Sequence, residues 1–330
     1  MDPKKPIVIS AIQATGNLHI GNYLGAVKNW VVLQESGLYD CYFFIADYHS
    51  LTGDMDHATR YNQIMRTATD LLAAGIDPTK STLFVQSAVP AHTELAWVFN
   101  CVTPVAELYR MTQFKDKSER QESNINSGLL TYPMLMAADI LLYHATLVPV
   151  GQDQVQHVEL TRDIARWFNN RYGNYFVETK ALLTDIPKVM SLLEPDKKMS
   201  KSKGPAHIIE LADEPEVIEA KLKKAVTATT GGQTSLGVDN LLLLLKHFGD
   251  GHIYEEFVSA EHAGTIRYAD LKQALAEAMG KYFSDFRAKR SELLQDVGSV
   301  ERLLEIGATK ARAAADTTMT DVRKIIGLRR

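Results

Sequence analysis

The sequence predicts an α/β fold in which a doubly wound parallel sheet is followed by an all-helical C-terminal region. In the first half of the chain, short apolar runs alternate with longer segments of helical periodicity, the pattern of a Rossmann-like sheet. Beyond Pro205, only helical patterns separated by glycine-containing turns recur. We therefore expect a sheet-containing domain at residues 1–204 and a helical domain at residues 205–330.

Length, charge and cysteine content narrow the class of protein. A chain of 330 residues can hold one large α/β domain and a smaller one. The net charge of −4 argues against a protein that coats nucleic acid non-specifically, although one face could still be basic. Cys41 and Cys101 lack metal-ligand spacing, so we expect both to be buried free thiols. Residues 1–6 lack the apolar core of a signal peptide, and the apolar run 241–245 is too short to cross a bilayer, which predicts a cytoplasmic protein.

The first element is an apolar run at residues 7–9, which reads as a strand leading into a glycine turn and a helix. Apolar side chains recur at helical spacing at Ile20, Tyr23, Leu24, Val27 and Val31. Backbone N–H groups at a helix start favour phosphate, and His19 beside Gly21 and Gly25 leaves room for a nucleotide. Taken alone, this turn fits a nucleotide site and an ordinary helix start equally well.

The next elements continue the alternation. Residues 41–46 read as a buried parallel strand that ends in polar residues up to His49, and 82–86 read as the following strand. Between them, residues 57–74 read as a helix closed by Gly75. Because ligands gather at the carboxyl ends of parallel strands, these polar residues are expected near the site.

An interruption follows at residues 104–132, which we interpret as an insertion at the sheet edge. The insertion could provide dimer contacts or a mobile lysine. Any one of its charged residues could equally be a solvated residue at the end of a helix. Pro133 is predicted to begin a helix over 134–145, because proline is favoured at a first helical position. That helix is apolar except for Asp139, whose carboxylate requires a partner if it is buried.

A second strand–glycine–helix unit consists of the strand 147–150, Gly151 and a helix to Tyr172. The loop at 197–205 then holds four lysines and two serines. Most lysine runs are solvated surface. However, this loop and the glycine turn at residues 13–25, here called the opening turn, could together clamp a triphosphate from two sides. Further helices are expected at 215–225, 236–248, 268–290 and 299–326.

Two motifs now carry a resemblance. His-Ile-Gly-Asn at 19–22 and Lys-Met-Ser-Lys-Ser at 198–202 resemble the paired motifs of class I aminoacyl-tRNA synthetases, and the rest of the chain is similar to their tryptophan branch. The supporting segments, in order, are Gly-Asn-Tyr-Leu-Gly-Ala at 21–26, Gly-Ile-Asp-Pro at 75–78, Met-Thr-Gln-Phe-Lys at 111–115, Leu-Leu-Thr-Tyr-Pro at 129–133, Leu-Met-Ala-Ala-Asp-Ile-Leu-Leu-Tyr at 135–143, Val-Pro-Val-Gly-x-Asp-Gln at 148–154 and Lys-Lys-Met-Ser-Lys-Ser at 197–202.

The resemblance implies a ligase that activates tryptophan with ATP and releases pyrophosphate. The tryptophanyl group then passes to the 2′-hydroxyl of the terminal adenosine of tRNA(Trp). It also implies Mg²⁺ bound through the ATP phosphates without a protein-ligated metal, a homodimer that uses the insertion, an anticodon-binding role for residues 205–330, and no DNA or membrane partner. Candidate tRNA contacts are Arg312, Arg323, Lys324, Arg329 and Arg330, although each of them, taken alone, is better explained as a solvated surface charge.

The resemblance also assigns a tryptophan pocket. Asp139 would accept the indole N–H, with Met136 packed on the ring one turn earlier. Tyr132 and Gln154 would hold the ammonium group. His49 either borders the pocket or is a structural histidine. The complete predicted pocket is Ile9, His49, Tyr132, Met136, Asp139 and Gln154.

The ATP site is assigned in the same way. Asp153 would take the ribose hydroxyls, and Gln13 would lie near the α-phosphate. The predicted ATP-binding residues are Gln13, Ala14, Thr15, Gly21, Asn22, Gly25, Gly151, Asp153, Val189, Met190, Lys198, Met199, Ser200, Lys201 and Ser202. The predicted catalytic residues are Gln13, His19, Lys115, Lys198 and Lys201, the lysines neutralising the β- and γ-phosphates.

The chain departs from the commonest family pattern in three places. Ala11 and Ala14 stand where the family usually has Gly and Pro, and Gln152 replaces a frequent Glu. Two alternative functions remain at this point, the related tyrosine ligase and a non-catalytic RNA-binding paralogue. Retention of Lys198 and Lys201 argues against the second alternative.

Overall fold

The computed structural model describes residues 5–14, 16–53, 56–111, 126–151, 154–183, 187–227 and 235–329. Three predicted site residues, Thr15, Lys115 and Asp153, lie outside these ranges, as do Gln152 and Arg330. No described helix is both long and apolar enough to cross a membrane.

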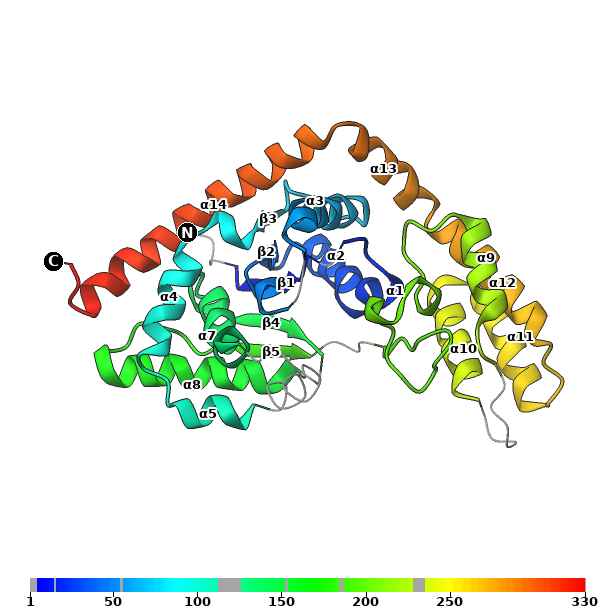
Figure 1. The fold of residues 1–330 in the computed structure, drawn as a ribbon, viewed down its shortest axis with the longest axis horizontal. Coiled ribbons are helices and arrows are strands. Elements are labelled where there is room, and N and C mark those ends of the chain that lie inside the picture. Colours follow the sequence, from blue (N-terminus) through cyan, green and yellow to red (C-terminus); the bar gives the residue numbers. More distant parts are fainter. Residues whose placement is uncertain are drawn as a thin grey trace.

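A five-stranded parallel sheet forms the centre of the molecule, in the order β3-β2-β1-β4-β5 (Figure 1). The strands are β1 (Ile7–Ile12), β2 (Asp40–Ile45), β3 (Ser81–Val85), β4 (Leu147–Val150) and β5 (Lys180–Leu183). The order reverses between β1 and β4, and a parallel sheet binds its ligands at such a switch point. The doubly wound sheet is confirmed; the sequence analysis missed β5, a four-residue strand with exposed ends.

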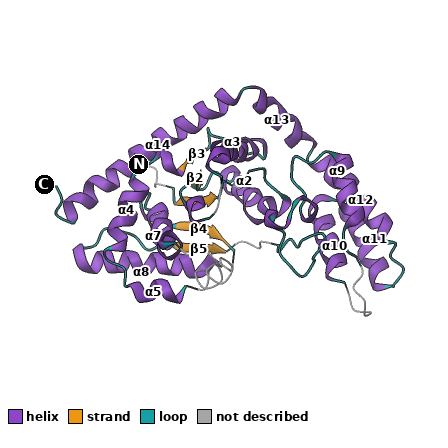
Figure 2. Cartoon of the chain, viewed as in Figure 1, coloured by secondary structure: helices purple, strands orange, loops and turns teal. Residues whose placement is uncertain are grey.

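Helices surround this sheet and then form a separate group (Figure 2). Those of the first part are α1 (Ile20–Asn22), α2 (Lys28–Glu35), α3 (His57–Ala73), α4 (Ala91–Asn100), α5 (Val105–Arg110), α7 (Ser127–Leu141) and α8 (Val155–Tyr172). Those of the second part are α9 (Pro215–Lys224), α10 (Leu236–Phe248), α11 (Gly251–His262), α12 (Tyr268–Tyr282), α13 (Ser284–Gln295) and α14 (Val297–Ile325). The predicted C-terminal helical region is confirmed.

Alternate side chains of each strand enter two different cores, as the pleat of a strand requires. Val8 and Phe43 face the side of α2 and α3, and this core continues into α9–α12. Ile9 and Phe44 face the side of α4, α7 and α8. Because the first core includes both the sheet and the helical group, the opening turn between them packs against apolar side chains from both.

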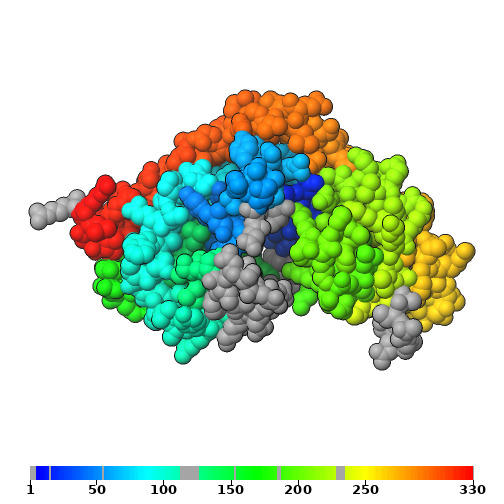
Figure 3. Space-filling model, in the orientation of Figure 1, coloured from blue at the N-terminus to red at the C-terminus, as the bar shows by residue number. Residues whose placement is uncertain are grey.

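Helix α14 returns from the helical group and lies beside β3 (Figure 1). In the space-filling view its orange-to-red surface runs along the upper edge of the molecule (Figure 3). Its apolar face includes Ala308, Ala311 and Ala315, all nearly inaccessible to solvent. At Gly307, a Cβ would lie 1.9 Å from the carbonyl oxygen of Leu83. Glycine is therefore required there by the close approach of the helix to the strand. The proposed division at residue 204 stays a prediction, but α14 is packed on the sheet-containing part.

We expect Gly307→Ala to lower the free energy of unfolding by about 1–3 kcal/mol, because the added methyl must displace α14 from β3. The matched control is Gly298→Ala in the same helix, where the nearest neighbours are side-chain ends at 3.4 and 3.5 Å. There alanine should leave stability unchanged or raise it by up to about 1 kcal/mol through helix propensity. Urea denaturation followed by circular dichroism measures both. Equal effects at the two glycines would contradict the close packing.

Three local predictions were wrong. Pro133 lies inside α7, which begins at Ser127 because the Asn126 side chain caps it by accepting a hydrogen bond from the Leu129 N–H. The segment 268–290 is two helices separated at Phe283, a buried residue. Cys101 is exposed, because it follows α4 at a surface turn; Cys41 on β2 is buried as expected. The helices α4, α5 and α11 were also not predicted.

Candidate active site

The opening turn places His19 at the N-cap position of α1. Its Nδ1 accepts a hydrogen bond from the Gly21 N–H at 3.1 Å, and the Asn22 side-chain oxygen accepts one from the His19 N–H at 3.2 Å. This reciprocal pair satisfies backbone donors at the helix start. A π-helical segment, Tyr23–Val27, follows and contains Gly25. Such segments are rare and are frequent at functional sites. Together these features fix the turn that follows β1.

Burial, together with the smaller effects of the nearby charges of Lys201 and Lys198, lowers the pKa of His19 to about 4. His19 is therefore neutral at pH 7. Because its Nδ1 accepts from Gly21, its proton is on Nε2, which can donate to an anionic ligand. The same two lysines were predicted to act with His19, and the fold brings all three together.

We expect Gly21→Ala to raise the KM for ATP by about tenfold, while the KM for the amino acid changes little. A Cβ at this position would lie 2.9 Å from Cε1 and 3.0 Å from Nδ1 of the His19 ring, so the ring must move and lose its cap. Steady-state pyrophosphate exchange measures both constants. Gly53→Ala is the control, because no atom of the described residues lies within 4 Å of a Cβ added at that position. An unchanged KM for ATP would show that the ring position does not matter.

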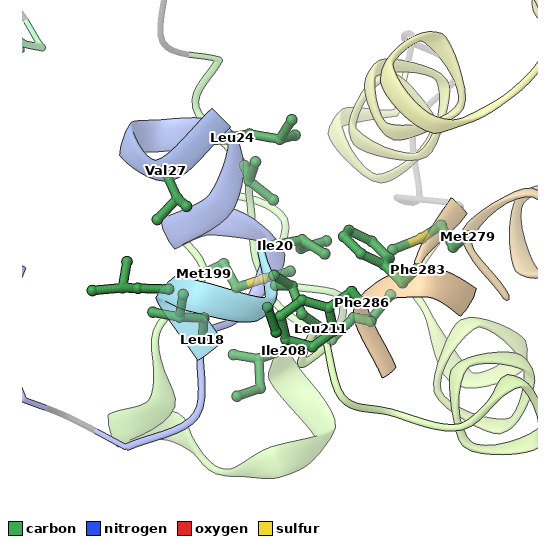
Figure 4. Close-up of a cluster of buried hydrophobic side chains, with 14 of the residues drawn as sticks. Leu18, Ile20, Leu24, Val27, Met199, Ile208, Leu211, Met279, Phe283 and Phe286 are labelled. Atoms are coloured by element: carbon green, nitrogen blue, oxygen red, sulfur yellow. The ribbon is translucent and has the colours of Figure 1, made fainter. Parts of the chain in front are cut away.

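The lysine-rich loop is anchored at its apolar residue. Met199 is buried, and its N–H donates to the Val189 carbonyl at 3.0 Å. Its side chain lies among Leu18, Ile20 and Ile208 of the core shown in Figure 4. The neighbouring Met190 exchanges two hydrogen bonds with the Asn240 side chain of α10. The loop is thus held against the opening turn by Met199 and tied to the helical group by Met190.

The four lysines of this loop divide into two pairs. Glu194 binds Lys197 at 2.8 Å and also binds Lys203. Hydrogen bonds from Lys197 and Lys203 hold the pKa of Glu194 at about 2. Lys198 and Lys201 instead act on His19. Burial lowers the pKa of Lys201, and the charges of Glu210 and Asp70 oppose that change. The two predicted catalytic lysines are therefore the ones whose charges act on the opening turn.

Asp139 on α7 is the centre of a buried polar network. Its Oδ1 accepts from Gln86 Nε2 at 2.7 Å and from His92 Nδ1 at 2.6 Å, and its Oδ2 accepts from His49 Nε2 at 2.8 Å. Burial raises the pKa of Asp139, but the hydrogen bonds from His49 and His92 outweigh it and lower the pKa overall. Asp139 is therefore an anion. Three bonds within the described chain use three of about four acceptor positions, which leaves Oδ2 able to accept a substrate N–H.

Gln86, His92 and Tyr143 were missed as members of this network. The Tyr143 hydroxyl donates to His92 Nε2 at 2.8 Å, since burial, and then the charge of Asp139, raise the pKa of that phenol. Gln86 is oriented by the Tyr48 N–H, which donates to Gln86 Oε1 at 3.1 Å. Only spatial proximity reveals these roles, because Tyr143 lies in an apolar run of the sequence and His92 belongs to none of its recognised motifs.

The remaining predicted pocket residues lie around this network. The rings of His49 and Tyr132 are packed edge to face, with their centroids 6.3 Å apart. The Tyr132 hydroxyl is 2.5 Å from His157 Nε2. Burial raises the pKa of Tyr132 to about 12, so it is a neutral phenol. Ile9 is buried on β1, and Met136 is partly buried against the same core. Gln154 is the residue that caps the start of α8, and its N–H donates to the carbonyl oxygen of Gly151, the residue after β4, at 3.0 Å.

The predicted phosphate residues gather at the opening turn and the loop. Gln13 is exposed and Ala14 fully buried just after β1. Ser200 Oγ and Ser202 Oγ are 3.0 Å apart. Val189 is buried, and its carbonyl oxygen accepts from the N–H of Met199, the residue before Ser200. Among the described residues, no group of three or more His, Cys, Asp or Glu side chains could hold a metal ion.

Comparison with known proteins agrees with this geometry. The family model described as tRNA synthetases class I (W and Y) matches residues 1–284. The chain therefore belongs to the class I tRNA synthetases of the tryptophan and tyrosine type. It is 45% identical over 329 residues to the tryptophan–tRNA ligase of Corynebacterium glutamicum, covering 97% of this chain and 94% of that one.

Solved structures give the same result. Tryptophanyl-tRNA synthetase from Campylobacter jejuni, complexed with ADP and tryptophan, is 35% identical, with a TM-score of 0.84 and coverage of 97% of this chain and 99% of that chain. The enzyme from Mycoplasma pneumoniae is 34% identical, with a TM-score of 0.84 and 98% coverage of both chains.

Proposed function

We propose that this chain is a tryptophan-specific tRNA ligase, and one observation supports its choice of substrate most directly. Asp139 is a buried anion that keeps an acceptor position on Oδ2. An indole ring is apolar except for one N–H, so a buried carboxylate among apolar residues recognises it. The relatives named as tryptophan–tRNA ligases, 41–45% identical over almost the whole chain, support the same substrate.

The first half-reaction would use the tryptophan pocket around Asp139 and the opening turn with its lysine loop. An oxygen of the tryptophan carboxylate attacks the α-phosphorus of ATP, and the bond to the bridging oxygen breaks, so that pyrophosphate leaves. His19, Lys198 and Lys201 would stabilise the charge that accumulates on the departing phosphates. Mg²⁺, which we expect to enter on the ATP phosphates, would neutralise further charge. Tyr132 and Gln154 would orient the ammonium group.

The second half-reaction transfers the tryptophanyl group from the adenylate to the 2′-hydroxyl of the terminal tRNA adenosine, which releases AMP. We propose that the helices after residue 205 contact the tRNA anticodon. Of the candidate contacts, Arg323 is already paired with Glu94, and Arg312 with Glu305 and the Ala88 carbonyl. Lys324 and Arg329 are the better candidates. A homodimer through the insertion at 104–132 and a cytoplasmic location also stay proposals.

Pyrophosphate exchange with tryptophan and with tyrosine tests the proposed function. ATP–pyrophosphate exchange should depend on tryptophan and be negligible with tyrosine, and acylation of tRNA(Trp) should follow. Preference for tyrosine would assign the chain to the tyrosine enzymes instead. Absence of exchange with either amino acid, in protein shown to be folded, would favour a non-catalytic RNA-binding role.

A further inference from the structure

One ion pair outside the predicted site reaches the opening turn. Asp70 on α3 is fully buried, and its Oδ1 accepts from Arg290 Nε of α13 at 2.6 Å. Its Oδ2 accepts from the Leu18 N–H at 2.7 Å. Arg290 Nη2 also donates to the Asn17 side-chain oxygen at 3.0 Å. The pair therefore holds the two residues that directly precede His19.

The same two residues are bonded to the segment that follows the lysine loop. Asn17 Nδ2 donates to Glu210 Oε2 at 2.8 Å, and the Leu211 N–H donates to the Leu18 carbonyl at 2.9 Å. Arg290 is thus the point at which α13, α3 and the opening turn are joined, and Asn17 extends this connection to Glu210. The charges of Asp70 and Glu210 both act on Lys201.

Stability alone is a weak explanation for this pair. A buried ion pair gains little over apolar side chains of the same size, because both charges must lose their hydration. The ion pair instead fixes the geometry of Asn17 and Leu18, and Arg290 neutralises the negative charge of Asp70. Burial already raises the pKa of Asp70, and Arg290 opposes that change. Without Arg290, the carboxylate would depend on the Leu18 N–H and on the charge of Lys201, for which it would compete with the phosphates of a nucleotide.

We propose that Arg290 is a positioning residue for ATP, which acts by holding Asn17 and Leu18 and by neutralising Asp70. This inference rests on the proposed function and assigns a substrate-positioning role to a residue of the C-terminal helical part. It requires that the loss of Arg290 affect ATP far more than tryptophan.

The test uses tryptophan-dependent exchange by the full-length protein. Arg290→Gln should raise the KM for ATP about tenfold or more, with the KM for tryptophan within about twofold of wild type. The double variant Asp70→Asn/Arg290→Gln should bring the KM for ATP back to within about threefold, because a neutral pair can keep the hydrogen bonds without a lone charge. Arg166→Gln is the control: Arg166 pairs with Glu178 at 2.8 Å on the exposed side of α8.

Several outcomes would overturn the proposal: an unchanged KM for ATP in Arg290→Gln, equal rises in both constants, or no recovery in the double variant. If Arg290→Gln does not fold, Asn17→Ala decides in its place, with a rise of about threefold or more expected in the KM for ATP. Direct calorimetric titration with ATP separates this inference from the proposed function. A weaker ATP affinity of Arg290→Gln would support the inference even if wild type lacked exchange, and an unchanged affinity would refute it.

Discussion

Lys201→Ala should slow tryptophanyl-adenylate formation by roughly 30- to 1,000-fold in kcat, equivalent to about 2–4 kcal/mol of transition-state stabilisation. The KM for tryptophan should remain near the wild-type value, because Lys201 acts on the opening turn, whereas Asp139 acts in the tryptophan pocket. Rapid-quench measurement of the first turnover isolates this step from product release.

Lys203→Ala is the matched control for this prediction. Lys203 belongs to the same loop, but it is bound to Glu194, which also keeps Lys197 as a partner. Its loss should leave adenylate formation within about twofold of wild type, since an exposed pair contributes little. Similar losses in the two variants would mean that the loop provides only general positive charge. Parallel losses in kcat and tryptophan binding would indicate damaged folding.

Asp139→Asn should lower kcat/KM for tryptophan by roughly 10- to 200-fold, as expected for a hydrogen bond to a charged group worth about 1.5–3 kcal/mol. The asparagine amide would direct N–H donors at donors already present on His92, Gln86 or His49. The KM for ATP should be unaffected. Unchanged kcat/KM for tryptophan would refute the role of this carboxylate.

A substrate analogue sharpens this second test. In 3-benzothienylalanine, sulfur replaces the indole N–H, so the analogue cannot donate to Asp139. Wild type should strongly prefer tryptophan, and Asp139→Asn should lose most of that preference. Asp163→Asn, at an exposed aspartate of α8, should retain it. An equal preference in wild type and Asp139→Asn would place the indole N–H elsewhere.

The sequence predicted the features that depend on local pattern. The apolar runs located β1 to β4. Because Asp139 is the one carboxylate in an apolar helical segment, the sequence also predicted that it needs a hydrogen-bond partner. The lysine loop and the opening turn were predicted to meet, and Met199 of the loop packs beside Leu18 and Ile20 of the turn (Figure 4).

The missed features depend on distant contacts or weak local signals. Asp70 and Arg290 are separated by 220 residues, and neither lies in a recognisable motif. Gln86 and His92 become partners of Asp139 only when α4 packs on α7. The start of α7 was misplaced because Asn126, rather than Pro133, supplies its cap.

The return of α14 onto β3 has a consequence for how the chain is made. Leu83 is synthesised early, whereas Gly307 and the alanines that cover this side of the sheet come near the end of the chain. At translation rates of about 5–20 residues per second, α14 is synthesised roughly tens of seconds or less after β3, and the β3 side of the sheet lacks this helix until then. During that interval, apolar side chains such as Phe84 lack the α14 surface that buries them in the finished molecule. Nascent chains stalled before α14 should therefore bind chaperones, and release should coincide with synthesis of the last helix.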